Sequence, residues 1–142
     1  MRILGLDLGD KRIGVSISDP LGLIAQGIDT IEARVNLEII NKVCEITALY
    51  NVEKIVIGLP KNMDGSLGLQ GEKSFLFGEE LKLRYSGEIV YYDERLTTRA
   101  ANAALLEGNI RRKDRKKKVD RIAAVLILQG YLDFMNNCKK EG

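Results

Sequence analysis

The sequence predicts an α/β domain built on a five-stranded mixed sheet with helices on both faces. Three strand-like segments separated by tight turns open the chain, a helix-strand-helix-strand succession follows, and two helical segments end it. Strands joined by short turns pair antiparallel, whereas strands separated by helices pair parallel. We therefore expect an antiparallel meander of the first three strands, extended by two parallel strands.

The first three strands are predicted from apolar runs bounded by turn residues. They are Ile3–Leu8, Arg12–Ser18 and Ile24–Glu32, with turns at Gly9–Lys11 and Asp19–Gly22. Asp7 is an acid inside the first apolar run. Because side chains alternate along a strand, Asp7 shares a face with Ile3 and Gly5. A carboxylate there needs compensation, since burying it without a partner costs several kcal/mol.

The middle of the chain alternates helical and strand patterns. Apolar residues recur with a helical period over Asn36–Tyr50 and Gln70–Tyr85. Lys54–Leu59 is almost wholly apolar, which is typical of a strand covered on both faces, and Glu88–Tyr92 is the fifth strand. Lys61–Gly71, rich in Gly, Asn and Asp, is predicted to be a loop.

Two helices are predicted after the fifth strand. The first is Arg99–Glu107, capped by Thr97 or Thr98 and ended by Gly108 and Asn109. We expect Asn109–Lys118 to be a surface loop and Val119–Asn136 to be the last helix. Its apolar face is expected to carry five residues: Ala123, Ala124, Ile127, Tyr131 and Phe134.

Composition limits the possible chemistry. The 142 residues suit a single domain over 1–142, and histidine is absent, which excludes histidine bases, triads and metal ligands. No apolar run approaches the roughly 18 residues of a membrane span, so we expect no membrane contact. Cys44 falls on an apolar helical stripe far from Cys138. A buried thiol in a reducing cytoplasm is therefore expected.

Basic residues are concentrated in residues 111–118, which hold seven bases and one acid. Such a segment can contact a phosphate backbone, although it can equally be a solvated loop. Within it, Arg111, Arg112 and Lys116 are the candidate contacts.

Three acids stand where a sheet and a helix could bring them together. Besides Asp7, Glu94 follows the carboxyl end of the fifth strand, where open α/β sheets bind ligands. Asp120 begins the last helix on its buried side, and the small Ala123 and Ala124 would let that helix approach the sheet. Converging carboxylates repel one another unless a divalent cation binds them, and Mg²⁺ or Mn²⁺ prefers oxygen ligands. Two such ions support phosphodiester cleavage.

Each acid also has a structural interpretation. Asp7 could belong to a turn or phosphate loop, Glu94 could pair with Arg95, and Asp120 could stabilise a helix N-terminus. Their joint placement favours a metal-dependent nuclease.

Four motifs resemble those of the YqgF/RuvX family, which comprises proteins described as Holliday-junction resolvases and pre-16S rRNA nucleases. They are GLDLGDKRIGV at 5–15, GLPKNMDG at 58–65, DERLTT at 93–98 and KKVDRIAA at 117–124. The resemblance covers nearly the whole chain and implies an RNase H-like fold. It also implies that Asp7, Glu94 and Asp120 are the acidic triad and that the substrate is precursor rRNA. The residues that it places near the scissile phosphate are Lys11, Arg12, Arg95, Thr97 and Thr98.

Three alternatives remain open at this point. The chain could cut branched DNA, or it could be a non-catalytic RNA-binding factor in ribosome assembly. The opening hairpin also resembles the phosphate-binding hairpin of actin-like sugar kinases, although that fold needs a duplicated domain. We expect a cytoplasmic protein that is a monomer or a weak homodimer.

Overall fold

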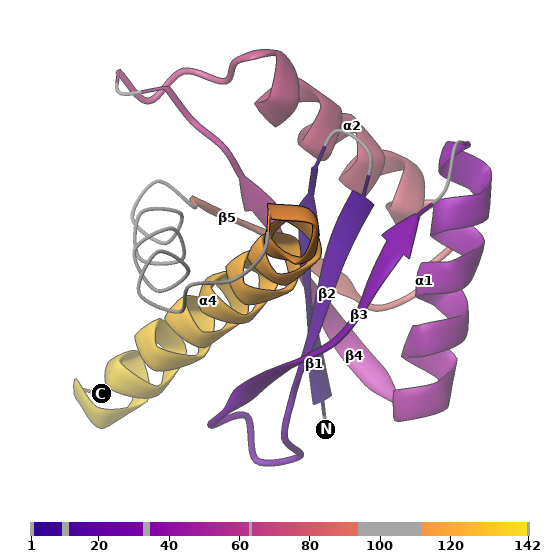
Figure 1. Ribbon diagram of the computed structural model, residues 1–142. Helices are drawn as coiled ribbons and strands as arrows, with labels where there is room; N and C mark the ends of the chain where they lie inside the picture. Colours follow the sequence, from indigo (N-terminus) through magenta and orange to yellow (C-terminus); the bar gives the residue numbers. More distant parts are fainter. Residues whose placement is uncertain (1, 10–11, 33–34, 63, 94–111, 142) are drawn as a thin grey trace.

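One mixed sheet carries the fold, with the strand order β3-β2-β1-β4-β5 (Figure 1). The computed structural model describes residues 2–9, 12–32, 35–62, 64–93 and 112–141, without the side chains of 112–121 and 139–141. The five strands are β1 (Arg2–Leu8), β2 (Arg12–Ser18), β3 (Ala25–Glu32), β4 (Val52–Leu59) and β5 (Glu88–Asp93). β1 pairs antiparallel with β2 and parallel with β4, while β2–β3 is antiparallel and β4–β5 parallel. This pairing confirms the predicted mixed sheet.

Helices α1 (Asn36–Tyr50) and α2 (Leu69–Lys82) cover one face of the sheet. The residues between them and the sheet form the larger core, in which alternate residues of β1 and β2 are buried with apolar side chains of both helices. Among its most buried members are Leu4, Leu6, Val15, Val43 and Leu81. The predicted loop Lys61–Gly71 extends three residues too far, because α2 already begins at Leu69.

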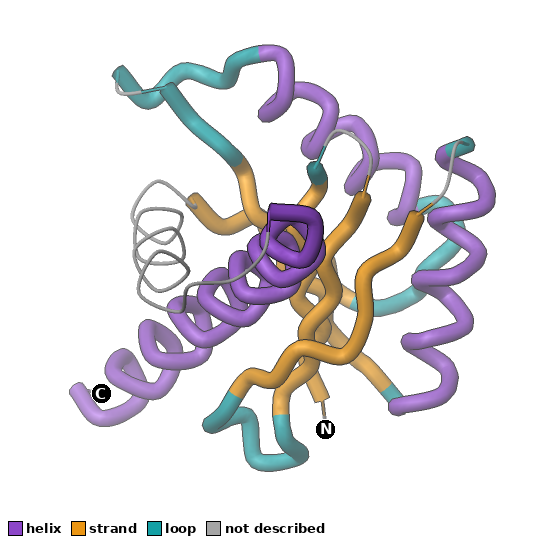
Figure 2. The backbone as a smooth tube through the Cα atoms, viewed as in Figure 1, coloured by secondary structure: helices purple, strands orange, loops and turns teal. Residues whose placement is uncertain are grey.

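Helix α4 (Arg112–Glu141) covers the opposite face (Figure 2). Its apolar side packs on the sheet through Ile127, Leu128, Tyr131 and Leu132. Helices therefore lie on both faces, as predicted. No helix in the described part of the chain is long and apolar enough to cross a membrane.

Two expectations about this last helix were wrong. It begins at Arg112 and not at Val119, so most of the predicted loop Asn109–Lys118 is helical. Lys and Arg are good helix formers, and no Gly or Pro interrupts the chain between Arg112 and Gln129, so the helix continues upstream of its apolar part. Phe134, expected on the buried face, is 60% exposed, while Leu132 and Met135 contact the sheet side.

The remaining expectations have mixed outcomes. Cys44 is half-buried against the larger core rather than fully buried, and Cys138 is exposed. The predicted helix Arg99–Glu107 lies outside the described residues.

Candidate active site

Asp7 lies near the carboxyl end of β1 and on the face covered by α4. Ile3 packs in the core beneath α4, and Gly5 faces Ala124 and Leu128 of that helix. Leu4 and Leu6 belong to the core on the other face. Strand alternation therefore places Asp7 with Ile3 and Gly5, as predicted.

Glycines flank Asp7 on both neighbouring strands. Gly14 of β2 is its direct partner in the antiparallel ladder. The parallel ladder pairs Leu6 with Ile57, so continuing it by one residue puts Gly58 of β4 beside Asp7. Neither neighbour has a side chain that could project beside the carboxylate, and both glycines are buried. Both glycines lie in the motifs GLDLGDKRIGV and GLPKNMDG, but residue patterns alone do not pair them with Asp7.

Helix α4 approaches β1 and β2 unusually closely. Ser16 is fully buried, and its hydroxyl donates a hydrogen bond to the carbonyl of Ala124 at 2.8 Å. A Cβ on Gly5 would lie 2.8 Å from the Cβ of Leu128 and would overlap the Ser16 hydroxyl. The contact thus depends on small residues from three elements, which confirms the expectation drawn from Ala123 and Ala124.

The contacts along α4 show that it runs antiparallel to β1. Ile3 lines a cavity with Tyr131 and Leu132, and Gly5, two residues further, meets Leu128 and Ala124. Two strand residues advance about 6.7 Å, close to the roughly 6 Å of four helical residues. Asp120, whose side chain is outside the described residues, is one helical turn before Ala124.

β5 ends at the same edge of the sheet as β1. Tyr92 faces α4, where its ring meets Tyr131 edge to face with centroids 6.5 Å apart. Asp93, paired with Leu59, is the last residue of the strand. Glu94 follows directly and lies outside the described residues. The carboxyl ends of three parallel strands therefore meet at the edge that carries Asp7.

Arg12 begins β2 at this edge. Its Nε lies 3.0 Å from a carboxylate oxygen of Glu32 on β3. Gly9, the residue after the end of β1, donates its N–H to the Arg12 carbonyl at 2.8 Å, which closes the hairpin. Arg12 is thus held near Asp7 on the neighbouring strand.

Five of the other predicted site residues lie outside the described residues: Lys11, Arg95, Thr97, Thr98 and Arg111. Arg112 and Lys116 belong to the first turns of α4, without described side chains. Among the residues whose side chains are described, no three Cys, Asp or Glu form a metal-binding group.

A structured loop borders the site and was missed by the sequence reasoning. Lys61 and Leu67 form a short antiparallel bridge, so part of the predicted Lys61–Gly71 loop is a tight hairpin. Inside it Ser66 donates backbone and side-chain hydrogen bonds to Asp64, which lower the pKa of that carboxyl. Gln70, just beyond, donates to the carbonyl of Leu8 at 2.8 Å. This bond ties the start of α2 to the end of β1.

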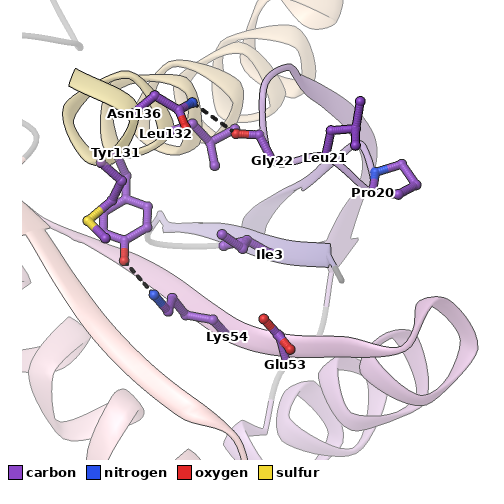
Figure 3. Close-up of a pocket in the computed structure, with 10 residues that line it drawn as sticks. Ile3, Pro20, Leu21, Gly22, Glu53, Lys54, Tyr131, Leu132 and Asn136 are labelled. Atoms are coloured by element: carbon purple, nitrogen blue, oxygen red, sulfur yellow. Dashed lines mark hydrogen bonds between the residues drawn. The ribbon is translucent and has the colours of Figure 1, made fainter. Parts of the chain in front are cut away.

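A cavity of about 130 Å³ lies at the other end of β1, between Ile3 and α4 (Figure 3). Lys54 in its wall donates a hydrogen bond to the Tyr131 hydroxyl at 2.8 Å and lies 3.6 Å from Glu88. The Tyr131 bond, helped by the charge of Glu88, raises the pKa of Lys54. Since this cavity opens at the Ile3 end of the strand, it is separate from the candidate site at Asp7.

Solved structures similar to this one define the class of fold. Thermus thermophilus RuvC, solved in complex with a Holliday junction substrate, matches with a TM-score of 0.60 and 14% identity over 96% of each chain. The Fowlpox virus resolvase, solved with Holliday junction DNA, matches with a TM-score of 0.57 and 13% identity over 95% of this chain and 99% of that one. The protein therefore has the RNase H-like fold.

The sequence comparisons then give the family. The model of the RuvX family, described as Holliday junction resolvase, matches residues 1–134. A Clostridium tetani protein named "Putative pre-16S rRNA nuclease" is 56% identical, over 96% of this chain and 99% of its own. A protein of the same name from Caldanaerobacter subterraneus subsp. tengcongensis is 52% identical over the same shares. The chain belongs to the RuvX family.

Proposed function

We propose that this protein is a metal-dependent endonuclease that processes the 5′ end of precursor 16S rRNA in the cytoplasm. Asp7, Glu94 and Asp120 are its catalytic acids. The observation that carries this proposal is the position of Asp7, a carboxylate at the carboxyl edge of a parallel sheet, between two glycines and beneath a close-packed helix.

The geometry of α4 supports the inclusion of Asp120. Ile3 lines a cavity with residues 131 and 132, and Gly5 faces residues 128 and 124. One further step of two strand residues and four helical residues relates Asp7 to position 120. Glu94 is included because it immediately follows a strand whose residue Tyr92 faces the same helix.

The donor set fits a hard divalent cation. Asp7 supplies carboxylate oxygen, and the glycines beside it bring no side chain that would compete with the ion. Asp7, Glu94 and Asp120 would hold Mg²⁺ or Mn²⁺. When bound, the metal supplies an activated water and stabilises the charge of the leaving oxygen.

The surrounding bases complete the proposed site. Lys11, Arg12 and Arg95 would neutralise the charge of the scissile phosphate, and Thr97 and Thr98 would donate hydrogen bonds to its oxygens. Arg111, Arg112 and Lys116 would bind the backbone further along the RNA. Arg112 and Lys116 are four residues apart in the sequence. Because this part of the chain is helical, they lie on one side of α4.

Cation binding without catalysis is the first test of this site. We expect Mg²⁺ or Mn²⁺ to raise the melting temperature of the wild type, because a ligand bound only by the folded state stabilises it. Asp120→Asn should lose this increase while keeping the metal-free melting temperature. Asp29→Asn, which changes an exposed acid on β3, is the matched control and should respond like the wild type. An undiminished response of Asp120→Asn would remove Asp120 from the metal site.

Cleavage of four-way DNA junctions is the second candidate function. The family description and the two resolvase structures favour it. The edge of the sheet that carries Asp7 would serve either substrate. Cleavage of precursor rRNA and of a four-way DNA junction must therefore be compared directly. A non-catalytic RNA-binding factor would bind RNA without metal-dependent cutting.

A further inference from the structure

Helix α2 carries three exposed leucines in a line. Leu69, Leu76 and the cap residue Leu83 are 81%, 61% and 85% exposed. They are spaced seven residues apart, so they share one side of the helix. Large apolar side chains in such a line on the surface indicate a contact with another molecule.

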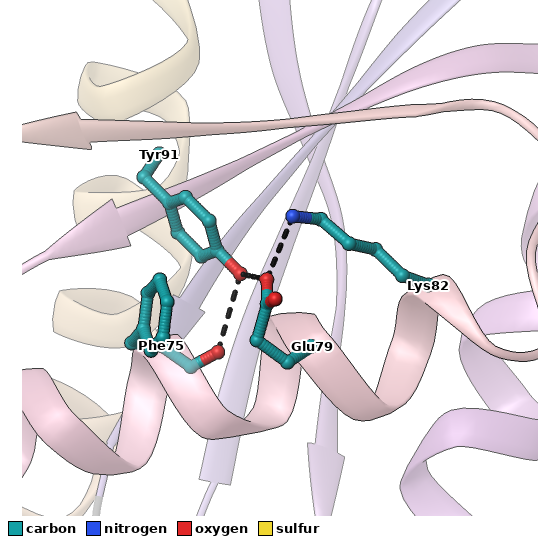
Figure 4. Close-up of polar contacts among 4 residues, drawn as sticks. All are labelled: Phe75, Glu79, Lys82 and Tyr91. Carbon is teal, nitrogen blue, oxygen red and sulfur yellow. Dashed lines mark hydrogen bonds and ion pairs between the residues drawn. The ribbon is translucent and has the colours of Figure 1, made fainter.

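The opposite side of α2 is anchored to its own sheet. Phe77 and Leu81 are buried in the larger core. Tyr91 of β5 donates hydrogen bonds to Glu79 at 2.7 Å and to the Phe75 carbonyl at 3.2 Å, and Lys82 binds Glu79 at 2.7 Å (Figure 4). These contacts fix the rotation of α2. The leucine line is therefore held pointing away from the domain.

Two opposite charges lie within the leucine line. Lys73 falls between Leu69 and Leu76, and Glu80 falls between Leu76 and Leu83; both are exposed. The order Leu-Lys-Leu-Glu-Leu follows alternating steps of four and three residues, which is the spacing of a helix-pairing seam. Lys73 and Glu80 are placed symmetrically about the midpoint between residues 76 and 77.

This symmetry identifies the partner. We propose that α2 pairs antiparallel with α2 of a second copy of this chain, around a two-fold axis beside Leu76. In that arrangement Lys73 of each copy faces Glu80 of the other, Leu76 meets its counterpart, and Leu69 lies near the opposite Leu83. A parallel pairing would set Lys73 against Lys73 and Glu80 against Glu80, which like-charge repulsion disfavours.

The charges also argue against the nucleic acid as the occupant of this surface. The exposed acids Glu72 and Glu80 are matched by the exposed bases Lys73 and Lys82, so α2 lacks the excess of positive charge that a phosphate backbone needs. The pairing surface lies on the α1 and α2 side of the sheet, whereas Asp7 faces α4. The dimer therefore leaves both candidate active sites accessible, and this proposal does not depend on the nuclease activity.

A single helix pair is a small interface, so a reversible dimer is expected. Sedimentation velocity of the full chain, from micromolar to near-millimolar concentration, should show a shift from monomer to dimer. Lys73→Glu and Glu80→Lys, each alone, should weaken dimerisation at least about tenfold, because each sets like charges together twice. Lys42→Glu on α1 makes the same charge change elsewhere and should dimerise like the wild type.

The decisive experiment mixes the two charge variants. Lys73→Glu then offers two acids and Glu80→Lys two bases, so the mixture should form a heterodimer at least as readily as the wild type forms its homodimer. Circular dichroism checks that every variant is folded. A wild type that stays monomeric at the highest concentration would overturn the proposal. So would a mixture that associates no better than either variant alone.

Discussion

At the scale of single residues, Arg12 has two roles: it forms an ion pair within the sheet, and it is proposed to contact the substrate phosphate. Its side chain is 24% exposed and pairs with Glu32, which is 57% exposed, at 3.0 Å. A partly exposed ion pair of this kind contributes about 0.2–1 kcal/mol. The pair therefore orients the guanidinium more than it stabilises the fold.

A pair of variants separates these two roles. We expect Arg12→Ala to lower stability by at most about 1 kcal/mol and to weaken the binding of RNA, because it removes a phosphate contact. Glu32→Gln breaks the same ion pair but keeps the guanidinium, so it should lose similar stability and retain RNA binding. Urea denaturation and filter binding measure the two quantities. Equal RNA binding by Arg12→Ala and the wild type would remove Arg12 from the substrate site.

At the scale of elements, the packing of α4 against β1 and β2 positions the proposed site. Gly5, Ser16 and Ala124 let the helix backbone approach the sheet, with the Ser16 hydroxyl 2.8 Å from the Ala124 carbonyl. Any added atom between them must move the helix or the strand. Since Asp7 and Asp120 come from these two elements, their separation depends on this contact.

Gly5→Ala tests the contact. The new Cβ would lie 2.8 Å from that of Leu128, and such overpacking typically costs about 1–3 kcal/mol. Gly68→Ala is the control: its Cβ would find its nearest heavy atom at 3.5 Å, and it should cost only about 0.5–1 kcal/mol, because alanine caps the start of α2 less well than glycine. Urea denaturation measures both. Equal stability of the two variants would show that α4 can shift freely.

The sequence predicted some elements better than others. Residue alternation and helical period located the five strands and α1 well, because these elements are amphipathic or wholly buried. The start of α4 was misjudged because its first turns are charged and have no apolar face to detect. Asp7 could be assigned to a face from alternation alone. Its glycine neighbours could not be recognised, because strand register is a tertiary property.

At the scale of the whole molecule, stability at high pH depends on tyrosines that are packed between helix and sheet. Tyr85 donates a hydrogen bond to the Val52 carbonyl at 2.9 Å. Burial, and secondarily the charge of Glu53, raises the pKa of Tyr85 to about 12. In the unfolded chain tyrosine titrates near pH 10. Between these values the unfolded state releases the proton first, so stability falls as pH rises.

Comparing the wild type with Tyr85→Phe isolates this effect. Below pH of about 10 the variant should be less stable by about 0.5–1.5 kcal/mol, because it lacks the hydrogen bond. The difference in stability should shrink as pH rises from about 10 to about 12. In this range the wild type loses stability because Tyr85 ionises more readily in the unfolded chain, whereas the variant has no hydroxyl at this position. Urea denaturation at several pH values measures it. A difference that stays constant over this range would contradict the raised pKa.

The most direct test of the proposed nuclease is single-turnover cleavage by the wild type and Asp7→Asn. The substrates are a labelled 5′ fragment of precursor 16S rRNA and a four-way DNA junction, each with Mg²⁺, Mn²⁺ or EDTA. We predict metal-dependent cutting of the RNA that falls at least about 100-fold in Asp7→Asn, with RNA binding retained. Asp29→Asn, purified in parallel, should cut like the wild type. Equal cutting by Asp7→Asn, or RNA binding without any metal-dependent cutting by the wild type, would contradict the proposed active site.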